Sequence, residues 1–152
     1  MSFDGAFSKS GKGAGIVLTS PSNQKFNFAY RLEFEASNNV AEYEALLQGL
    51  EIAKDMGIKV LSIKGDSDLI ISQVKNLFAC KCRRLKKYRN DVWDTMEYFS
   101  ALDLMAVPRL ENSEADKLAV ATSILELTEE LIKGNGKFEI NFRLSVPNNL
   151  NH

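Results

Sequence analysis

The sequence predicts a mixed α/β (α+β) domain in which helices cover a five-stranded mixed sheet. Three strand-like segments come first, and helical periodicity then alternates with two further strand-like segments, in the order β-β-β-α-β-α-α-β-α. Strands that follow one another through short turns pair antiparallel, whereas strands joined through a helix pair in parallel. We therefore expect three antiparallel strands followed by parallel ones, flanked by helices.

Three strands are expected at the start of the chain. Phe3 lies in a very short strand, followed by Asp4-Gly5 and a Gly-rich loop. Residues 14–19 form a β-branched run that ends in turn formers at residues 20–23. In residues 26–32 large apolar side chains alternate with Asn27, Ala29 and Arg31, which is typical of a half-buried strand. Together the three segments predict an antiparallel meander.

A helix is expected to follow, capped by Asn38 or Asn39 and ended by Gly57. Each residue of an α-helix advances by about 100°, so acids two positions apart lie on different faces. Glu42 lies at the edge of the apolar stripe, where small neighbours would let another backbone approach. Glu44 lies on a face that we expect to be exposed to solvent. That face consists of Glu44, Gln48, Glu51 and Asp55.

The remaining elements follow from the same patterns. We expect a buried strand at residues 60–64, a further strand at residues 102–107, a short helix through residues 70–74, a longer helix at about residues 85–99 and a last helix at about residues 113–132. The composition changes after Lys133, where Asn becomes frequent. We therefore predict a domain of residues 1–132 and a C-terminal tail or linker of residues 133–152.

Composition and charge exclude several classes of protein. The chain has 152 residues and a formal net charge of -1, which fits one domain without a basic surface over the whole molecule. Its one histidine is the terminal His152, which disfavours Ser-His-Asp and Cys-His mechanisms. Cys80 and Cys82 have no partner cluster for a zinc site, and no apolar run is long enough to span a membrane. We expect an intracellular monomer, cytoplasmic or nuclear, without membrane association or a small-molecule cofactor.

Four acids lie at strand positions or in first helical turns, where a carboxylate has a structural or functional role more often than on an open surface. They are Asp4, Glu42, Asp66 and Asp116. Each also has a plain structural explanation: a turn former, an acid in a first helical turn, a helix cap and part of a capping box, in that order. Taken together, the four could converge at one end of one sheet. They would then repel one another and raise their own pKa values unless divalent cations lay between them. Hard, oxygen-preferring ions such as Mg²⁺ are expected.

The ordered set of motifs resembles type 1 ribonuclease H, in particular the ribonuclease H-like domains of plant retroelement polyproteins, parts of reverse transcriptase polyproteins. The resemblance covers about residues 2–125. The matching segments are Phe3-Asp4-Gly5-Ala6, Gly13-Ala14-Gly15-Ile16-Val17-Leu18, Asn38-Asn39-Val40-Ala41-Glu42-Tyr43-Glu44-Ala45-Leu46, Gly65-Asp66-Ser67, Pro108-Arg109 and Asn112-Ser113-Glu114-Ala115-Asp116-Lys117-Leu118-Ala119.

The resemblance implies a ribonuclease H-like fold, a metal site and a reaction. The family's four catalytic, metal-binding carboxylates correspond to Asp4, Glu42, Asp66 and Asp116. They would hold two Mg²⁺ ions, with Mn²⁺ as a substitute, and no nucleophilic histidine is needed. The implied activity is that of an endonuclease that hydrolyses the RNA strand of an RNA–DNA hybrid, leaving 5′-phosphate and 3′-hydroxyl ends.

Candidate nucleic-acid-binding residues come from two places. The resemblance implies that Asn38 and Asn39 contact the hybrid, and Ser67 beside the strand aspartate joins them. Residues 80–89 hold six basic residues and no acid, and this basic segment is either a solvated helix start or a phosphate-contacting patch. We favour the patch. Its candidates are Lys81, Arg83, Arg84, Lys86 and Lys87.

Departures from the family's pattern, among them the short first strand, Asp68 and above all position 106, keep two alternatives open. Many active members have a histidine ten residues before the last aspartate, where this chain has Ala106. The first alternative is a catalytically weak or inactive ribonuclease H-like module that binds nucleic acid. The second is a structural piece of a retroelement polyprotein that packs between neighbouring domains.

Overall fold

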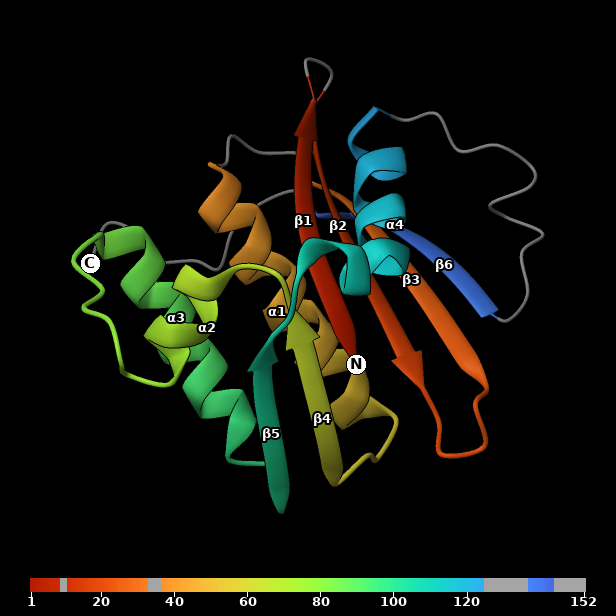
Figure 1. Cartoon of the computed structure of the whole chain (residues 1–152), viewed down its shortest axis with the longest axis horizontal. Helices are drawn as coiled ribbons and strands as arrows, with labels where there is room; N and C mark the ends of the chain where they lie inside the picture. The colour runs from red at the N-terminus through yellow and green to blue at the C-terminus, as the bar shows by residue number, and fades with distance from the viewer. Residues whose placement is uncertain (9–10, 33–36, 125–136, 144–152) are drawn as a thin grey trace.

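The computed structural model describes residues 1–8, 11–32, 37–124 and 137–143, and its elements follow the predicted order (Figure 1). The strands are β1 (Ser2–Ser8), β2 (Gly11–Thr19), β3 (Lys25–Leu32), β4 (Val60–Gly65), β5 (Ala101–Ala106) and β6 (Lys137–Arg143). The helices are α1 (Asn38–Asp55), α2 (Asp68–Val74), α3 (Arg83–Met96), the short 3-10 helix η1 (Arg109–Asn112) and α4 (Ser113–Ile124). The predicted end of the last helix, residues 125–132, lies outside the described residues.

The strands form one mixed sheet in the order β5-β4-β1-β2-β3-β6. β1, β2 and β3 pair antiparallel, and β4 pairs in parallel with both β1 and β5, which confirms the five-stranded mixed sheet that the sequence predicts. β6 was not expected. It pairs in parallel with β3 along its whole length and lies within the segment predicted as a tail or linker. The domain boundary after residue 132 stays a prediction.

Two predictions about the strands are wrong. The Gly-rich loop expected after a very short first strand belongs to the β1–β2 hairpin, in which Gly15 pairs with Asp4 and Gly13 with Ala6. β4 is not buried on both faces, since Leu61 and Ile63 point into the core whereas Val60 is 69% exposed. The core covers only one face of this half of the sheet.

Helices cover both faces of the β1–β2–β3 meander (Figure 1). α1 packs on the face that carries Ile16 and Leu18 and forms the main apolar core there. α4 packs on the opposite face, where Val17 contributes to a smaller cluster with Ala115 and Leu118 of α4. Residues of β2 therefore alternate between two helices, as the two-residue period of a strand requires.

Glycines let both helices approach the strands to backbone distance. A Cβ atom at Gly5 would lie 2.5 Å from the carbonyl carbon of Ala41 and 2.7 Å from the amide nitrogen of Glu42, both in α1. A Cβ atom at Gly15 would collide with the carbonyl oxygen of Ala115 in α4. Any larger residue would push a helix away from the sheet, so these two positions set the depth at which α1 and α4 pack.

The start and one face of α1 differ from expectation. Ser37 caps the helix by accepting a hydrogen bond from the amide of Val40, and Asn38 and Asn39 are its first residues instead. Glu44 is fully buried, although its face was expected to meet solvent. α3 packs over this part of α1, whereas Glu51 and Asp55 on the same face remain exposed. A pattern along one helix does not report which second helix will cover it.

None of the helices within the described part of the chain combines the length and the apolar character needed to cross a membrane.

We predict that Gly15→Ala destabilises the protein by about 1–3 kcal/mol, the usual cost of overpacking, because its methyl group would collide with the backbone of α4. Chemical denaturation monitored by circular dichroism measures the change. Gly49→Ala in the middle of α1 is the matched control, since its methyl group meets the flexible end of the Met1 side chain and makes an ordinary contact with Ile16, without meeting backbone, and alanine favours a helix. An equal loss in both variants would contradict the close-approach argument.

Candidate active site

The candidate site lies where β1 and β4 separate. These parallel strands share one ladder pair, Ser2 with Lys64, next to a hydrogen bond from the Lys64 amide to the Met1 carbonyl oxygen (2.8 Å). The Met1 amine donates to the carbonyl oxygen of Ser62 (2.6 Å), which holds the start of β1. Beyond this point the strands no longer pair. Asp4 lies just past the pair on β1, and Asp66 directly follows β4.

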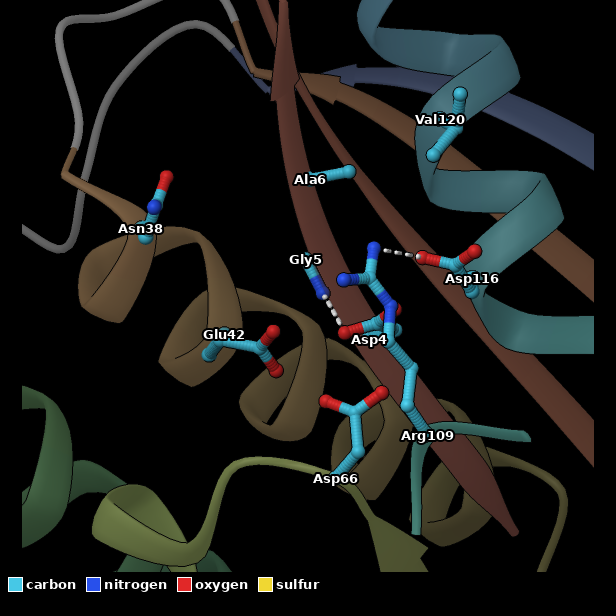
Figure 2. Close-up of a pocket in the computed structure, with 9 residues that line it drawn as sticks. All are labelled: Asp4, Gly5, Ala6, Asn38, Glu42, Asp66, Arg109, Asp116 and Val120. Atoms are coloured by element: carbon cyan, nitrogen blue, oxygen red, sulfur yellow. Dashed lines mark hydrogen bonds and ion pairs between the residues drawn. The ribbon is translucent and has the colours of Figure 1, made fainter. Parts of the chain in front are cut away.

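Three acids from three elements meet at this fork. Asp4 of β1, Glu42 of α1 and Asp66 each offer a carboxylate oxygen, and these oxygens lie within 4.8 Å of one another. Figure 2 shows the three carboxylates turned toward one another. Asp4 is 3% exposed and Glu42 9%, so two of the acids are buried. Asp4 Oδ1 also accepts a hydrogen bond from the amide of Gly5 (3.0 Å).

The plain structural explanations fail for these three acids. Asp4 lies within the β1 ladder and not in a turn. Glu42 lies beyond the first turn of α1, which contains no acid. Ser67, not Asp66, caps α2, with its hydroxyl oxygen accepting a hydrogen bond from the amide of Ile70 (3.3 Å). A cap, a turn or a helix dipole therefore does not account for this cluster.

Asp116 faces the same cavity from the other side. It lies in the first turn of α4, as expected, and its Oδ1 accepts a long hydrogen bond from Arg109 Nη2 at 3.5 Å, in place of the expected capping box (Figure 2). It is not among the three acids whose oxygens lie within 4.8 Å of one another. The cavity, about 440 Å³ in volume, is lined by Asp4, Gly5, Ala6, Asn38, Glu42, Asp66, Arg109, Asp116 and Val120. All four predicted acids thus face one cavity.

Two residues of the site had no predicted role although the matching segments contain them. The Arg109 side chain is 78% exposed and brings a positive charge to a cavity of acids. Asn112 is 1% exposed, and its Nδ2 donates to the Phe3 carbonyl oxygen (2.8 Å) and to Asp66 Oδ2 (3.4 Å). Asn112 thereby bridges the gap between β1 and the end of β4. Its spacing of four residues from Asp116 was the available signal, because such a pair shares one side of a helical segment.

Burial and mutual repulsion hold protons on the cluster. Burial raises the pKa of the Asp4 carboxyl from 3.8 to about 7, and the neighbouring carboxyl groups of Asp116 and Asp66 add to the increase. Burial also raises the pKa of Glu42, and its contact with Asp4 is the next cause. Among the described residues, Glu42 Oε2 is buried and has no hydrogen-bond partner. A bound cation would supply positive charge to the buried carboxyls of Asp4 and Glu42.

The candidate nucleic-acid-binding residues separate into two groups. Asn38 is exposed and lines the cavity, whereas Asn39 is half-buried and does not line it, and the Ser67 hydroxyl caps α2. The basic segment lies at the start of α3, which packs against α1, and none of its residues lines the cavity. Lys81, Arg83 and Lys86 are exposed, Arg84 and Lys87 are half-buried, and Lys87 pairs with Asp91 at 3.0 Å.

Comparison with curated proteins finds related sequences. Ribonuclease HI of Halobacterium salinarum is 34% identical over 84 residues, which are 55% of this chain and 42% of that protein. A bifunctional protein of Mycobacterium tuberculosis is 33% identical over 84 residues, 55% of this chain and 23% of that protein. The aligned region thus spans less than half the length of these two relatives.

Solved structures cover more of the chain. The RNase H1 structure of Halobacterium salinarum has a TM-score of 0.72 at 29% identity and covers 83% of this chain and 96% of its own. LC11-RNase H1, solved in complex with an RNA/DNA hybrid, has a TM-score of 0.73 at 27% identity and covers 84% of this chain and 97% of its own. The fold is therefore the ribonuclease H fold. Because the family model described as reverse transcriptase-like matches residues 2–122, the chain belongs to the reverse transcriptase-like family.

Proposed function

We propose that this protein is a divalent-metal-dependent endonuclease that hydrolyses the RNA strand of RNA–DNA hybrids. The observation that carries the proposal is the convergence of Asp4, Glu42 and Asp66 within 4.8 Å in a cavity that Asp116 and Arg109 also line. The sequence and fold likeness to RNase H1 supports it, as does the hybrid bound to LC11-RNase H1.

The acids fit a hard divalent cation. The donor set consists of carboxylate oxygens, which Mg²⁺ and Mn²⁺ prefer, and no histidine or thiolate joins it among the described residues. The Glu42 Oε2 atom without a partner among the described residues and the raised pKa values of Asp4 and Glu42 fit a site that takes a cation. We propose that Asp4, Glu42, Asp66 and Asp116 hold two ions, Mg²⁺ by preference. When bound, such ions activate a water molecule and stabilise the leaving 3′-oxygen.

The chain's own residues position the acids and the substrate. Asn112 holds the Asp66 carboxylate against β1, so that Asp66 keeps its place beside Asp4. Arg109 is placed to exchange its long contact with Asp116 for a phosphate oxygen of the substrate, a group that a guanidinium binds well. Asn38, exposed at the edge of the cavity, offers donors to the 2′-hydroxyl groups that distinguish RNA from DNA.

Ala106 supports a second candidate function. It is exposed at the end of β5 and offers no proton donor or acceptor where many family members have a histidine. A ribonuclease H-like module that binds hybrids but cleaves them weakly or not at all would still contain the four acids and the basic segment. The carboxylates do the central work in our primary proposal, so Ala106 should slow turnover more than abolish it.

Several narrower predictions accompany the proposal. They are a plant retroelement origin, neighbouring polyprotein domains as partners, a monomeric state and a cytoplasmic or nuclear location. Cys80 and Cys82 are both free thiols, which suits a reducing compartment.

We expect the protein to cleave a labelled RNA–DNA hybrid in Mg²⁺ and to cut only the RNA strand. Asp66→Asn should lower the rate at least 100-fold, because a neutral amide replaces one acid of the cluster, while the variant still binds the hybrid. Gel electrophoresis of end-labelled strands measures cleavage, and fluorescence anisotropy measures binding. If the unchanged protein binds without cleaving, the inactive-module alternative replaces the enzyme proposal. If it does neither, both are wrong.

The metal-free protein should lose stability as pH rises from about 5 to 8. The pKa values of Asp4 and Glu42 are raised by folding, so in this range the folded protein retains protons that the unfolded chain has released, and a rising pH favours unfolding. Melting temperatures in EDTA across this range test the trend, and Glu42→Gln should flatten it. Added Mg²⁺ should raise the melting temperature most at pH 8. A melting temperature that rises with pH in EDTA would contradict the argument.

Neutralising the basic segment should weaken hybrid binding evenly across sequences. Lys86→Gln should reduce the slope of log K against log salt by about 1, the value expected for one lost phosphate contact. Lys64→Gln, a change at another exposed lysine, on β4, is the control and should leave the slope unchanged. Both are measured by anisotropy in the Asp66→Asn background. Equal slopes for Lys86→Gln and the control would show that the basic segment is a solvated helix start.

A further inference from the structure

Glu44 is a buried carboxylate for which the proposed chemistry has no use. It lies two residues after Glu42 on α1, is fully buried, and faces α3 and not the acid cluster. Its Oε1 accepts a hydrogen bond from Gln48 Nε2 (2.9 Å), and its Oε2 accepts one from the Tyr88 hydroxyl (2.6 Å). Burying a carboxylate is costly compared with burying an apolar side chain of the same size. Its presence calls for a role that packing alone does not supply.

Tyr88 connects this carboxylate to the helix that carries the basic segment. Tyr88 is fully buried in α3, between the half-buried Arg84 and Lys87 on one side and the exposed Lys86 on the other. Its ring stacks on Tyr43 of α1, with centroids 6.1 Å apart and planes at 18°. The position of Tyr88 therefore sets how α3 is rotated about its own axis, and so where its cations point.

Two other hydrogen bonds complete the attachment of these helices. The Tyr43 hydroxyl donates to Gln73 Oε1 of α2 (2.8 Å). Trp93, one turn beyond Tyr88, donates from Nε1 to the Val74 carbonyl oxygen at the end of α2 (2.8 Å). Trp93 thus anchors the second half of α3 to α2. The Glu44–Tyr88 bond anchors the first half, where the basic residues lie, directly to α1.

We propose that the Glu44–Tyr88 hydrogen bond fixes the position of the basic segment relative to the acid cluster, and so sets where along a bound hybrid the RNA is cut. Two positions along a helix correspond to a rotation of about 200° about its axis, so the two side chains point in nearly opposite directions. α1 therefore presents Glu42 to the cluster and Glu44 to α3 at the same time. Glu44 and Tyr88 are positioning residues, because neither lines the cavity. The inference rests on the proposed function and adds a determinant of the cutting register.

The test compares Tyr88→Phe with Tyr98→Phe in the full chain. Tyr88→Phe removes the hydroxyl but keeps the stacked ring. Tyr98 is a half-buried tyrosine whose ring contacts Phe99, Lys59 and Lys54 and is not a partner in the Glu44–Tyr88 bond. Hybrid cleavage in Mg²⁺ gives KM and kcat, and sequencing gels of end-labelled RNA give the cut positions. A titration calorimetry measurement of Mg²⁺ affinity reports on the acid cluster alone.

We expect Tyr88→Phe to raise KM three- to tenfold, to spread the cuts over additional positions, and to leave kcat and Mg²⁺ affinity within about twofold of the unchanged protein. Glu44→Gln keeps an acceptor for the Tyr88 hydroxyl and should keep the original cut positions. Glu44→Leu removes the acceptor and should spread the cuts as Tyr88→Phe does. Tyr98→Phe should change none of these quantities.

Two outcomes would overturn the inference and are distinguishable. If the unchanged protein cleaves the hybrid while Tyr88→Phe shows the same KM and cut positions, the inference alone is wrong. If the unchanged protein neither cleaves nor binds the hybrid, the proposed function falls first, and the inference falls with it.

Discussion

The packing of two helices onto opposite faces of one hairpin is the constraint on which this structure depends. β1 and β2 lie between α1 and α4, and glycines at positions 5 and 15 leave no side chain to hold either helix away. Glu42 then approaches Asp4 from one side, and Asp116 faces the same cavity from the other. Carboxylates repel one another, and a rigid, close-packed interior helps to keep them together. The favourable free energy of packing the two helices offsets the repulsion among the acids.

The fold was predictable where local patterns and global packing agree. Alternation in residues 26–32 and the apolar stripe of α1 each identify the type of element, and the five predicted strands are found in the expected order. They do not identify every buried position, since Arg31 of β3 is buried as well. Glu44 shows where this reasoning stops. The face of α1 that carries Glu44 is polar and periodic, yet α3 buries the first half of that face. The burial is possible because Tyr88, 44 positions later in the chain, donates a hydrogen bond to the Glu44 carboxylate. The cap at Ser37 was missed for a simpler reason, since three adjacent polar residues suit the role equally well.

The candidate site was predictable in its acids but not in their support. A carboxylate beside a buried strand is conspicuous in a sequence, because it is costly there without a purpose. Asn112 does not stand out in the sequence, since an asparagine before a helix is ordinary. Its bridge from Phe3 to Asp66 is possible only because β1 and β4 separate after a single pair. Arg109 acquires meaning in the same way, from a cavity formed by distant segments. Such residues can be found only once the strands are placed side by side.

The order of the acids along the chain has a consequence for biosynthesis. Asp4, Glu42 and Asp66 belong to the first half of the chain, whereas Arg109, Asn112 and Asp116 emerge from the ribosome together and much later. Until α4 has been made, the apolar patch around Val17 is uncovered and the bridge from Asn112 to Phe3 is missing. Until then the cavity lacks the side that carries Arg109, Asn112 and Asp116, so the three acids of the first half of the chain gain their full surroundings only after α4 has been synthesised.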